Sequence, residues 1–230
     1  MVEGGNWGCF VTKEIRIYIE GGGDSKTIGQ PLRLGFQKFF RDILQKCRAK
    51  NIRLKIISRG GRDAAFDDFK TALRTYPEAF NILLVDAEGP VEENFKPWEH
   101  LKKRVGDEWD KPKGVNDDHC HLMVETMEAW FMADLEALEK YYGKDLKRNL
   151  LPRNPKVEDI PKEDLKKKLK AATPNREYHE IRHASDLLEL IDVAKVRKAA
   201  PHCNHLFKTL ENEINKLWHI EKVVNKSGFR

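Results

Sequence analysis

The sequence predicts an α/β fold: a mostly parallel four-stranded sheet with flanking helices, followed by a C-terminal helical appendage. Three observations predict it. Short apolar runs alternate with amphipathic helical segments, two of these runs end in glycine and acidic residues, and after Gly143 the chain becomes lysine-rich and interrupted by proline. Strands that alternate with crossover helices are typical of parallel sheets.

The elements follow in order along the chain. Short strand-like runs bounded by turn residues predict strands at residues 15–20, 52–58, 82–85 and 119–124, and the first of them is rich in β-branched residues. Helical spacing of apolar residues predicts helices over 32–48, 63–73, 98–105 and 125–141. Further helices are expected at 162–171, 186–190, 193–198 and 206–218. We therefore expect an α/β core over residues 1–143 and a basic helical extension over 144–230 that packs on this core.

Composition favours a cytoplasmic protein that does not enter the membrane. Of the 230 residues, 34% are charged, and no apolar stretch approaches the roughly 20 residues that a membrane-spanning helix needs. The N-terminus has neither the basic nor the apolar region of a secretory signal. The four cysteines lie far apart, which suits a reducing compartment better than a disulfide framework.

The net charge of +5 is unevenly distributed. Residues 1–139 carry 21 Lys and Arg against 24 Asp and Glu, whereas residues 140–230 carry 21 against 13. A basic half beside an acidic one could attract a polyanion such as nucleic acid. A solvated helical face would give the same excess, and the two interpretations are equally compatible with the sequence.

Acidic residues close two of the predicted strands. Glu20 ends the first strand and is followed by three glycines and Asp24, while Asp86 ends the third strand and precedes Glu88 by two residues. Neighbouring parallel strands would bring these carboxylates to one sheet edge, where their mutual repulsion favours a divalent cation. Either segment alone could be an ordinary glycine turn or a helix cap.

The motifs I-E-G-G-G-D and V-D-A-E-G resemble the Toprim fold, in which a glutamate after the first strand and a D-x-D pair bind Mg²⁺ in primases, topoisomerases and OLD-type nucleases. The resemblance assigns Glu20 to the lone glutamate, Asp86 and Glu88 to the acid pair, and Asp24 to the extra acid that OLD-type nucleases use for a second metal. Glu88 departs from the pattern, because the family usually has Asp there.

Longer segments are similar to a poorly characterised bacterial Toprim-like family, often encoded beside an ATPase and suspected in phage defence. The matching segments are residues 17–24, 35–40, 60–70, 84–91, 121–134 and 191–201. This resemblance implies an antiviral role and a separate ATPase partner, and it implies little about chemistry. No G-x-x-x-x-G-K-[ST] motif occurs in the chain, so any ATP hydrolysis must come from another subunit.

Other residues are weaker candidates for the same site. Glu128 could be a further acid or a base that orients water, or it could form a surface ion pair. Arg59 and Arg62 flank a glycine pair that opens a helix, so they could hold phosphate, although an ordinary β–α turn is slightly favoured. Lys166 and Lys167 could contact a nucleic-acid backbone, but such lysine runs are usually only solvated.

Histidine motifs raise the alternative of a zinc site. Residues 179–183 read H-E-x-x-H, but no apolar helical stripe or third ligand accompanies them, so a zinc peptidase is disfavoured. His119 and His121, and the group at 202–205, also contain metal-ligand residue types without a complete set.

These observations predict a Mg²⁺- or Mn²⁺-dependent nuclease that cleaves nucleic-acid phosphodiesters with water as nucleophile. Glu20, Asp86 and Glu88 would hold the primary metal, and Asp24 with Glu128 a second. The alternative is a non-catalytic partner subunit of an ATPase that uses the same scaffold for docking or regulation.

Overall fold

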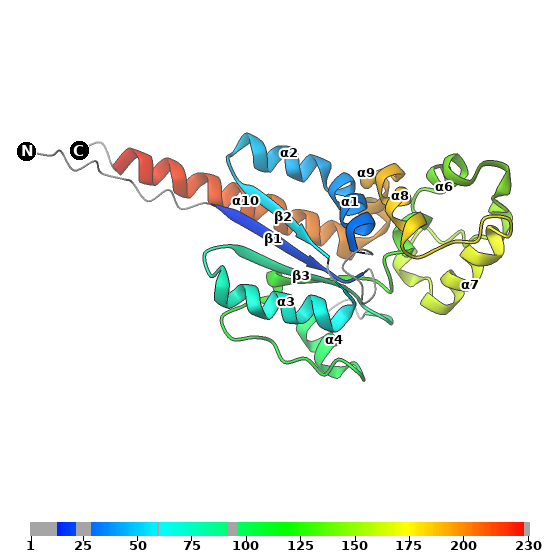
Figure 1. Ribbon diagram of the computed structural model, residues 1–230, viewed down its shortest axis with the longest axis horizontal. Coiled ribbons are helices and arrows are strands. Elements are labelled where there is room, and N and C mark those ends of the chain that lie inside the picture. The colour runs from blue at the N-terminus through cyan, green and yellow to red at the C-terminus, as the bar shows by residue number, and fades with distance from the viewer. Residues whose placement is uncertain (1–12, 22–28, 59, 92–95, 228–230) are drawn as a thin grey trace, which may run out of the picture.

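A computed structural model of the chain describes residues 13–21, 29–58, 60–91 and 96–227. Within them, four parallel strands form one sheet in the order β2-β1-β3-β4 (Figure 1). Their bounds are β1 (Glu14–Ile19), β2 (Arg53–Ile57), β3 (Phe80–Asp86) and β4 (Cys120–Met123). The structure confirms the predicted α/β class, the four strands and their parallel direction.

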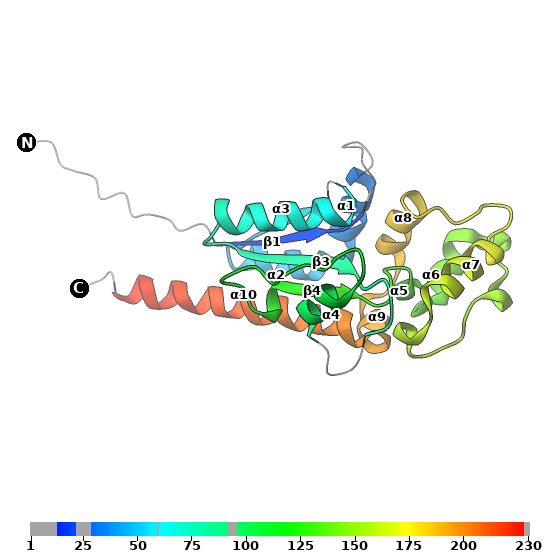
Figure 2. The same ribbon diagram turned by 90° about the horizontal axis from the view of Figure 1, so that it is seen from below.

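The two faces of the sheet carry different helices, as alternation of side chains along each strand requires. On one face, Ile17 and Leu84 are fully buried in a core that also contains side chains of α1 (Gly29–Phe39), α2 (Arg41–Ala49), α8 (Arg182–Leu190) and α10 (Pro201–Ser227). On the other face, Tyr18 and Leu83 pack with α3 (Arg62–Thr75) and α4 (Pro97–Lys103). The result is a three-layer arrangement of helices around a sheet with two buried faces (Figures 1 and 2).

The last helix belongs to the core of the sheet. Cys203, Leu206, Phe207 and Leu210 of α10 are each at most 2% exposed and lie in the same apolar cluster as Ile17. Helix α9 (Val193–Ala199) leads into it. No helix in the described ranges is both long and apolar enough to cross a membrane.

Two helices lie apart from the sheet. Figure 2 shows α6 (Leu135–Tyr142) and α7 (Lys162–Ala172) in a lobe beyond the carboxyl ends of the strands. Short 3₁₀ turns connect this part of the chain: η2 (Gly143–Asp145), η3 (Arg148–Leu150) and η4 (Val157–Asp159), with η1 (Asp117–His119) preceding β4. The strand ends therefore face a helical lobe, and side chains from both meet there.

Helix α8 approaches α1 very closely. A Cβ atom placed on Gly35 of α1 would lie 2.7 Å from the carbonyl oxygen of Ser185, and the Ser185 hydroxyl donates to the Pro31 carbonyl oxygen at 2.5 Å. Glycine is required here because it alone allows the two backbones to approach to this distance.

Two of the predicted helices are wrong in extent. Residues 32–48 form two helices, because the backbone leaves the helical conformation at Phe40 (φ −89°, ψ 17°). The segment 125–141 is helical only in α5 (Ala129–Met132) and α6. Its first residues bond across the ends of β3: the backbone N–H of Met127 donates to the Asp86 carboxylate, and the Glu125 carbonyl accepts from the backbone N–H of Glu88. These tertiary bonds replace the first helical turn.

Candidate metal centre

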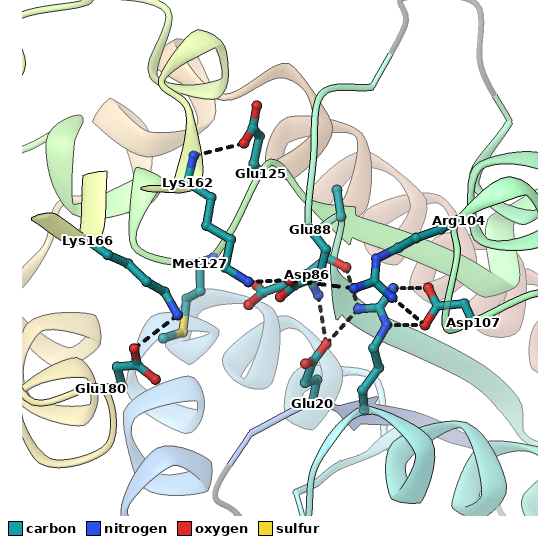
Figure 3. Close-up of polar contacts among 12 residues, drawn as sticks. Glu20, Asp86, Glu88, Arg104, Asp107, Glu125, Met127, Lys162, Lys166 and Glu180 are labelled. Atoms are coloured by element: carbon teal, nitrogen blue, oxygen red, sulfur yellow. Dashed lines mark hydrogen bonds and ion pairs between the residues drawn. The ribbon is translucent and has the colours of Figure 1, made fainter. Parts of the chain in front are cut away.

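The carboxylates predicted to converge do so at the carboxyl ends of β1 and β3. Strand pairing continues one residue beyond β1, where the Glu20 backbone N–H donates to Leu84 O at 3.0 Å. The Glu20 side chain then accepts from the Asp86 backbone N–H at 3.1 Å. One carboxylate oxygen from each of Glu20, Asp86 and Glu88 lies within 4.8 Å of the other two (Figure 3). The predicted juxtaposition of these three acids is confirmed.

The backbone of Glu88 takes an unusual conformation to reach the cluster. Its φ angle is +63°, in the left-handed region that non-glycine residues rarely adopt. The strand register is extended by Ala87, whose N–H donates to the Met123 carbonyl at 2.8 Å, and the Glu88 N–H donates to Glu125 at the same distance. Such a conformation costs on the order of 1 kcal/mol and persists because these neighbouring bonds fix it.

Arg62, at the start of α3, ties the cluster to the rest of the fold. Its guanidinium donates to both carboxylate oxygens of Asp107, at 2.6 and 2.5 Å, and also to Glu20 at 2.9 Å and to the Asp86 carbonyl at 2.5 Å. Arg104 adds a further bond to Asp107 at 2.9 Å. Arg62 thus orients Glu20, and its expected contact with phosphate stays a prediction.

Helix α7 presents lysines to the acids from the lobe. Lys162 forms an ion pair with Glu88, and the backbone N–H of Lys162 donates to Glu125 at 2.8 Å, which fixes the start of the helix (Figure 3). One turn later, Lys166 pairs with Glu180 at 2.9 Å. The spacing of four residues puts both lysines on one face of α7.

Glu128 is buried beside the cluster. It immediately precedes α5, is 4% exposed and accepts a hydrogen bond of 3.0 Å from the Tyr178 hydroxyl. Its charge helps to raise the pKa of Asp86, which places it in the electrostatic environment of the acids. The described geometry does not include Glu128 in the three-carboxylate group itself.

Burial and mutual repulsion shape the electrostatics. Burial raises the pKa of Asp86 well above its ordinary value, and the charges of Glu20, Glu128 and Glu88 raise it further. Burial also raises the pKa of Glu20, although the Arg62 charge and the Asp86 N–H oppose this. For Lys166, burial works to lower the pKa, but the hydrogen bond to Glu180 and nearby acidic charges raise it overall. Burial and the repulsion between neighbouring carboxylates therefore disfavour the ionised forms of Asp86 and Glu20.

The acidic cluster could hold a metal ion. It offers three hard carboxylate oxygens, the donors that divalent cations such as Mg²⁺ and Ca²⁺ prefer. Oxygens bound at about 2.1 Å on opposite sides of an ion lie about 4.2 Å apart, and those bound at about 2.4 Å lie about 4.8 Å apart. Separations of up to 4.8 Å therefore suit one shared cation, with slight closure for a small one.

Four predicted site residues have other outcomes. Asp24 and Arg59 lie outside the described residues. Lys167 is exposed, and Lys166 faces the acids as described above. The sequence did not predict a role at the site for three further residues, Lys162, Arg104 and Tyr178. Lys162 could have been found from its spacing of four residues from Lys166, whereas no local pattern marks Arg104 or Tyr178.

The zinc motif lacks the helix that it requires. His179 precedes α8, Glu180 pairs with Lys166, and the Nδ1 atom of His183 lies 3.0 Å from the Tyr142 hydroxyl oxygen. In the described part of the chain, the group of potential ligands that lie close enough for one metal is the three carboxylates. The histidines near 119–121 and 202–205 are not part of it.

Comparison with known families gives a match over most of the chain. A model described as Domain of unknown function (DUF4276) matches residues 19–211. The chain belongs to the DUF4276 family. The DUF4276 match contains Glu20, Asp86 and Glu88 together with Lys162 on the facing helix. No curated protein and no solved structure matches the chain.

Proposed function

We propose that this protein is a Mg²⁺- or Mn²⁺-dependent nuclease that hydrolyses phosphodiester bonds of nucleic acids. The observation that supports it is the convergence of Glu20, Asp86 and Glu88 at the carboxyl ends of neighbouring parallel strands, the edge at which open α/β sheets bind ligands. All three donors are carboxylates, which favours a hard divalent cation over zinc.

Each side chain has a distinct role in this proposal. Glu20, Asp86 and Glu88 hold the ion, which when bound supplies charge neutralisation at the phosphate and activation of water. Arg62 fixes Glu20, and the Met127 N–H fixes Asp86. Asp24 and Glu128 remain the proposed acids for a second ion.

The lysines of α7 supply the complementary charge. Lys162 is 18% exposed in its side chain and reaches Glu88 from across the cluster, so a phosphate that joins the metal would lie beside its ammonium group. Lys166 lies one turn farther along the same face. These cations can stabilise the additional negative charge that develops at phosphorus during hydrolysis.

Cleavage assays with charge-neutral isosteres test the proposal. Wild type, Glu20→Gln and Asp86→Asn should be incubated with plasmid DNA, single-stranded DNA and RNA in Mn²⁺, Mg²⁺ or EDTA. We expect metal-dependent cleavage by wild type and at least about a hundredfold loss in both variants. Glu78→Gln is the matched control, because Glu78 is an exposed glutamate outside the cluster. Equal cleavage by all four proteins would contradict the assignment.

One observation favours the alternative of a non-catalytic partner subunit of an ATPase. Two of the three acids already carry cationic partners from the chain, Arg62 on Glu20 and Lys162 on Glu88. Such pairing could make the cluster a structural ion-pair network. Titration calorimetry with Mn²⁺ separates the two functions: no binding of Mn²⁺, together with no cleavage, would favour the subunit.

A further inference from the structure

A cavity adjoins the acidic cluster on the side opposite α7. Residues 87–90 and the C-terminal end of α4 enclose about 280 Å³, and the cavity is lined there by His100, Lys103 and Arg104. The Glu88 side chain belongs both to this lining and to the three-carboxylate group. The cavity and the candidate metal centre are therefore contiguous.

The ionisable side chains that line this cavity are basic, apart from Glu88. The Arg104 guanidinium lies 3.7 Å from Glu88 and is held by Asp107 at 2.9 Å. The ring nitrogen Nε2 of His100 lies 2.7 Å from the Ala87 carbonyl and fixes the loop against α4. A Cβ atom built on Gly89 would meet no atom within 4 Å, so this side of the loop is open. The chemistry of the lining suits an anion.

Cations therefore flank the acids on two opposite sides. Figure 3 shows Lys162 and Lys166 on one side of Asp86 and Arg104 on the other. A lone phosphate ester needs only one of these groups of cations. A polymer with a phosphate at each linkage, bound with one phosphate at the metal, would extend toward both.

We propose that the cavity beside α4 binds the phosphate next to the scissile one, with the side chains of Lys103 and Arg104 as the cationic part of its lining. This inference rests on the proposed nuclease function. In the proposed complex, the nucleic-acid backbone runs from α7, across the acidic cluster, to α4.

A chemical double-mutant cycle tests the contact. Short single-stranded DNA and RNA oligonucleotides would carry one neutral methylphosphonate, scanned across the linkages, and affinity would be measured by fluorescence anisotropy in Ca²⁺, which accepts the same oxygen ligands. With the methylphosphonate at one particular linkage, we expect wild type to bind about fivefold more weakly than it binds the unmodified oligonucleotide. In Lys103→Ala, the same modification should weaken binding less than about twofold. Lys103→Ala should also make the dependence of log affinity on log salt less steep by about 0.7–0.9.

Lys102→Ala is the matched control, because Lys102 is the adjacent lysine of α4 and lies outside this cavity, where it pairs with Asp110 at 2.8 Å. It should retain the full methylphosphonate effect. An equal effect in Lys103→Ala and wild type would overturn the α4 contact while leaving the nuclease intact. Binding with the expected cycle but without cleavage in Mn²⁺ would overturn the nuclease alone, and no binding of DNA or RNA by wild type would overturn both.

Discussion

Replacement of Asp86 by Asn should stabilise the metal-free protein and abolish its response to metal. The Asp86 carboxylate lies within 4.8 Å of two others, and burial together with these neighbours raises its pKa. In wild type, the Met127 N–H donates to the Asp86 carboxylate at 2.9 Å. Asn has nearly the same shape as Asp, and its side-chain carbonyl oxygen can accept the same hydrogen bond. The substitution therefore removes charge while keeping the local bond.

The size of the effect follows from the distances. Two like charges 4.8 Å apart repel by about 3.5 kcal/mol at an effective dielectric constant of about 20. Asp86 has two such neighbours, but Arg62 and Lys162 lie on those same neighbours and cancel most of the repulsion. We expect a net gain of about 1–3 kcal/mol, or roughly 3–9 °C in Tm for a chain of this size.

The gain should depend on pH. A carboxyl group with a higher pKa in the folded state binds its proton more tightly when folded, so wild-type stability falls as pH rises from the unfolded value near 4 toward the raised folded value. The difference in Tm between Asp86→Asn and wild type should therefore be small near pH 4 and grow as the pH rises toward the raised folded-state pKa of Asp86.

Thermal denaturation in EDTA and in Mn²⁺ measures both effects. At a metal concentration 100 times its Kd, wild type should gain about 2.7 kcal/mol, whereas Asp86→Asn should gain little, so the order of stability reverses. Glu78→Gln, an exposed control, should follow wild type. If Asp86→Asn is less stable than wild type in EDTA at neutral pH, or responds fully to Mn²⁺, the electrostatic account of the cluster is wrong.

Three further predictions concern the surroundings of the site. Lys162→Met should bind Mn²⁺ more tightly by calorimetry, because it frees Glu88, yet cleave at least about tenfold more slowly because the phosphate loses a cation. Gly35→Ala should lower stability by about 1–3 kcal/mol in thermal denaturation, because its Cβ would lie 2.7 Å from the Ser185 carbonyl. Burial, reinforced by neighbouring histidines, lowers the pKa of His121 to about 3. Wild type should therefore lose about 2.3 kcal/mol of unfolding free energy between pH 6.5 and 4.5 by urea denaturation, a loss that His121→Gln should largely remove.

The first two of these predictions have matched controls, and the third compares wild type directly with His121→Gln. Lys168→Met removes an exposed lysine of α7 and should change neither metal affinity nor cleavage. Gly61→Ala meets no atom within 4 Å and should cost only a few tenths of a kcal/mol. The first prediction would be contradicted by tighter metal binding in the Lys168 variant, and the second by equal losses in the two glycine variants. Parallel pH profiles for wild type and His121→Gln would contradict the third.

The sheet and its acids could be predicted because their signals are local. Buried parallel strands read as continuous apolar runs, and the carboxyl ends of neighbouring strands must share an edge, so Glu20 and Asp86 could be expected to meet. The segment 125–128 could not, because its helical pattern is overridden by bonds to Asp86 and Glu88 from another strand. The pairing of Lys162 with Glu88 joins residues 74 positions apart, and no sequence pattern specifies it.

Packing alone does not account for the acids at the strand ends. Glu88 occupies a left-handed backbone conformation, and burial beside other carboxylates raises the pKa of Asp86, which disfavours its ionised form. Each of these features lowers stability, and an uncharged residue in place of Asp86 would relieve the repulsion. The first residue of α7, Lys162, donates its backbone N–H to Glu125 and forms an ion pair with Glu88 through its side chain. The position of α7 is therefore coupled to the charge of the cluster. A cation that binds the acids must compete with Lys162 for Glu88. Metal binding should therefore release the α7 lysine toward the face where a phosphate would arrive, which links occupancy of the metal centre to capture of the substrate.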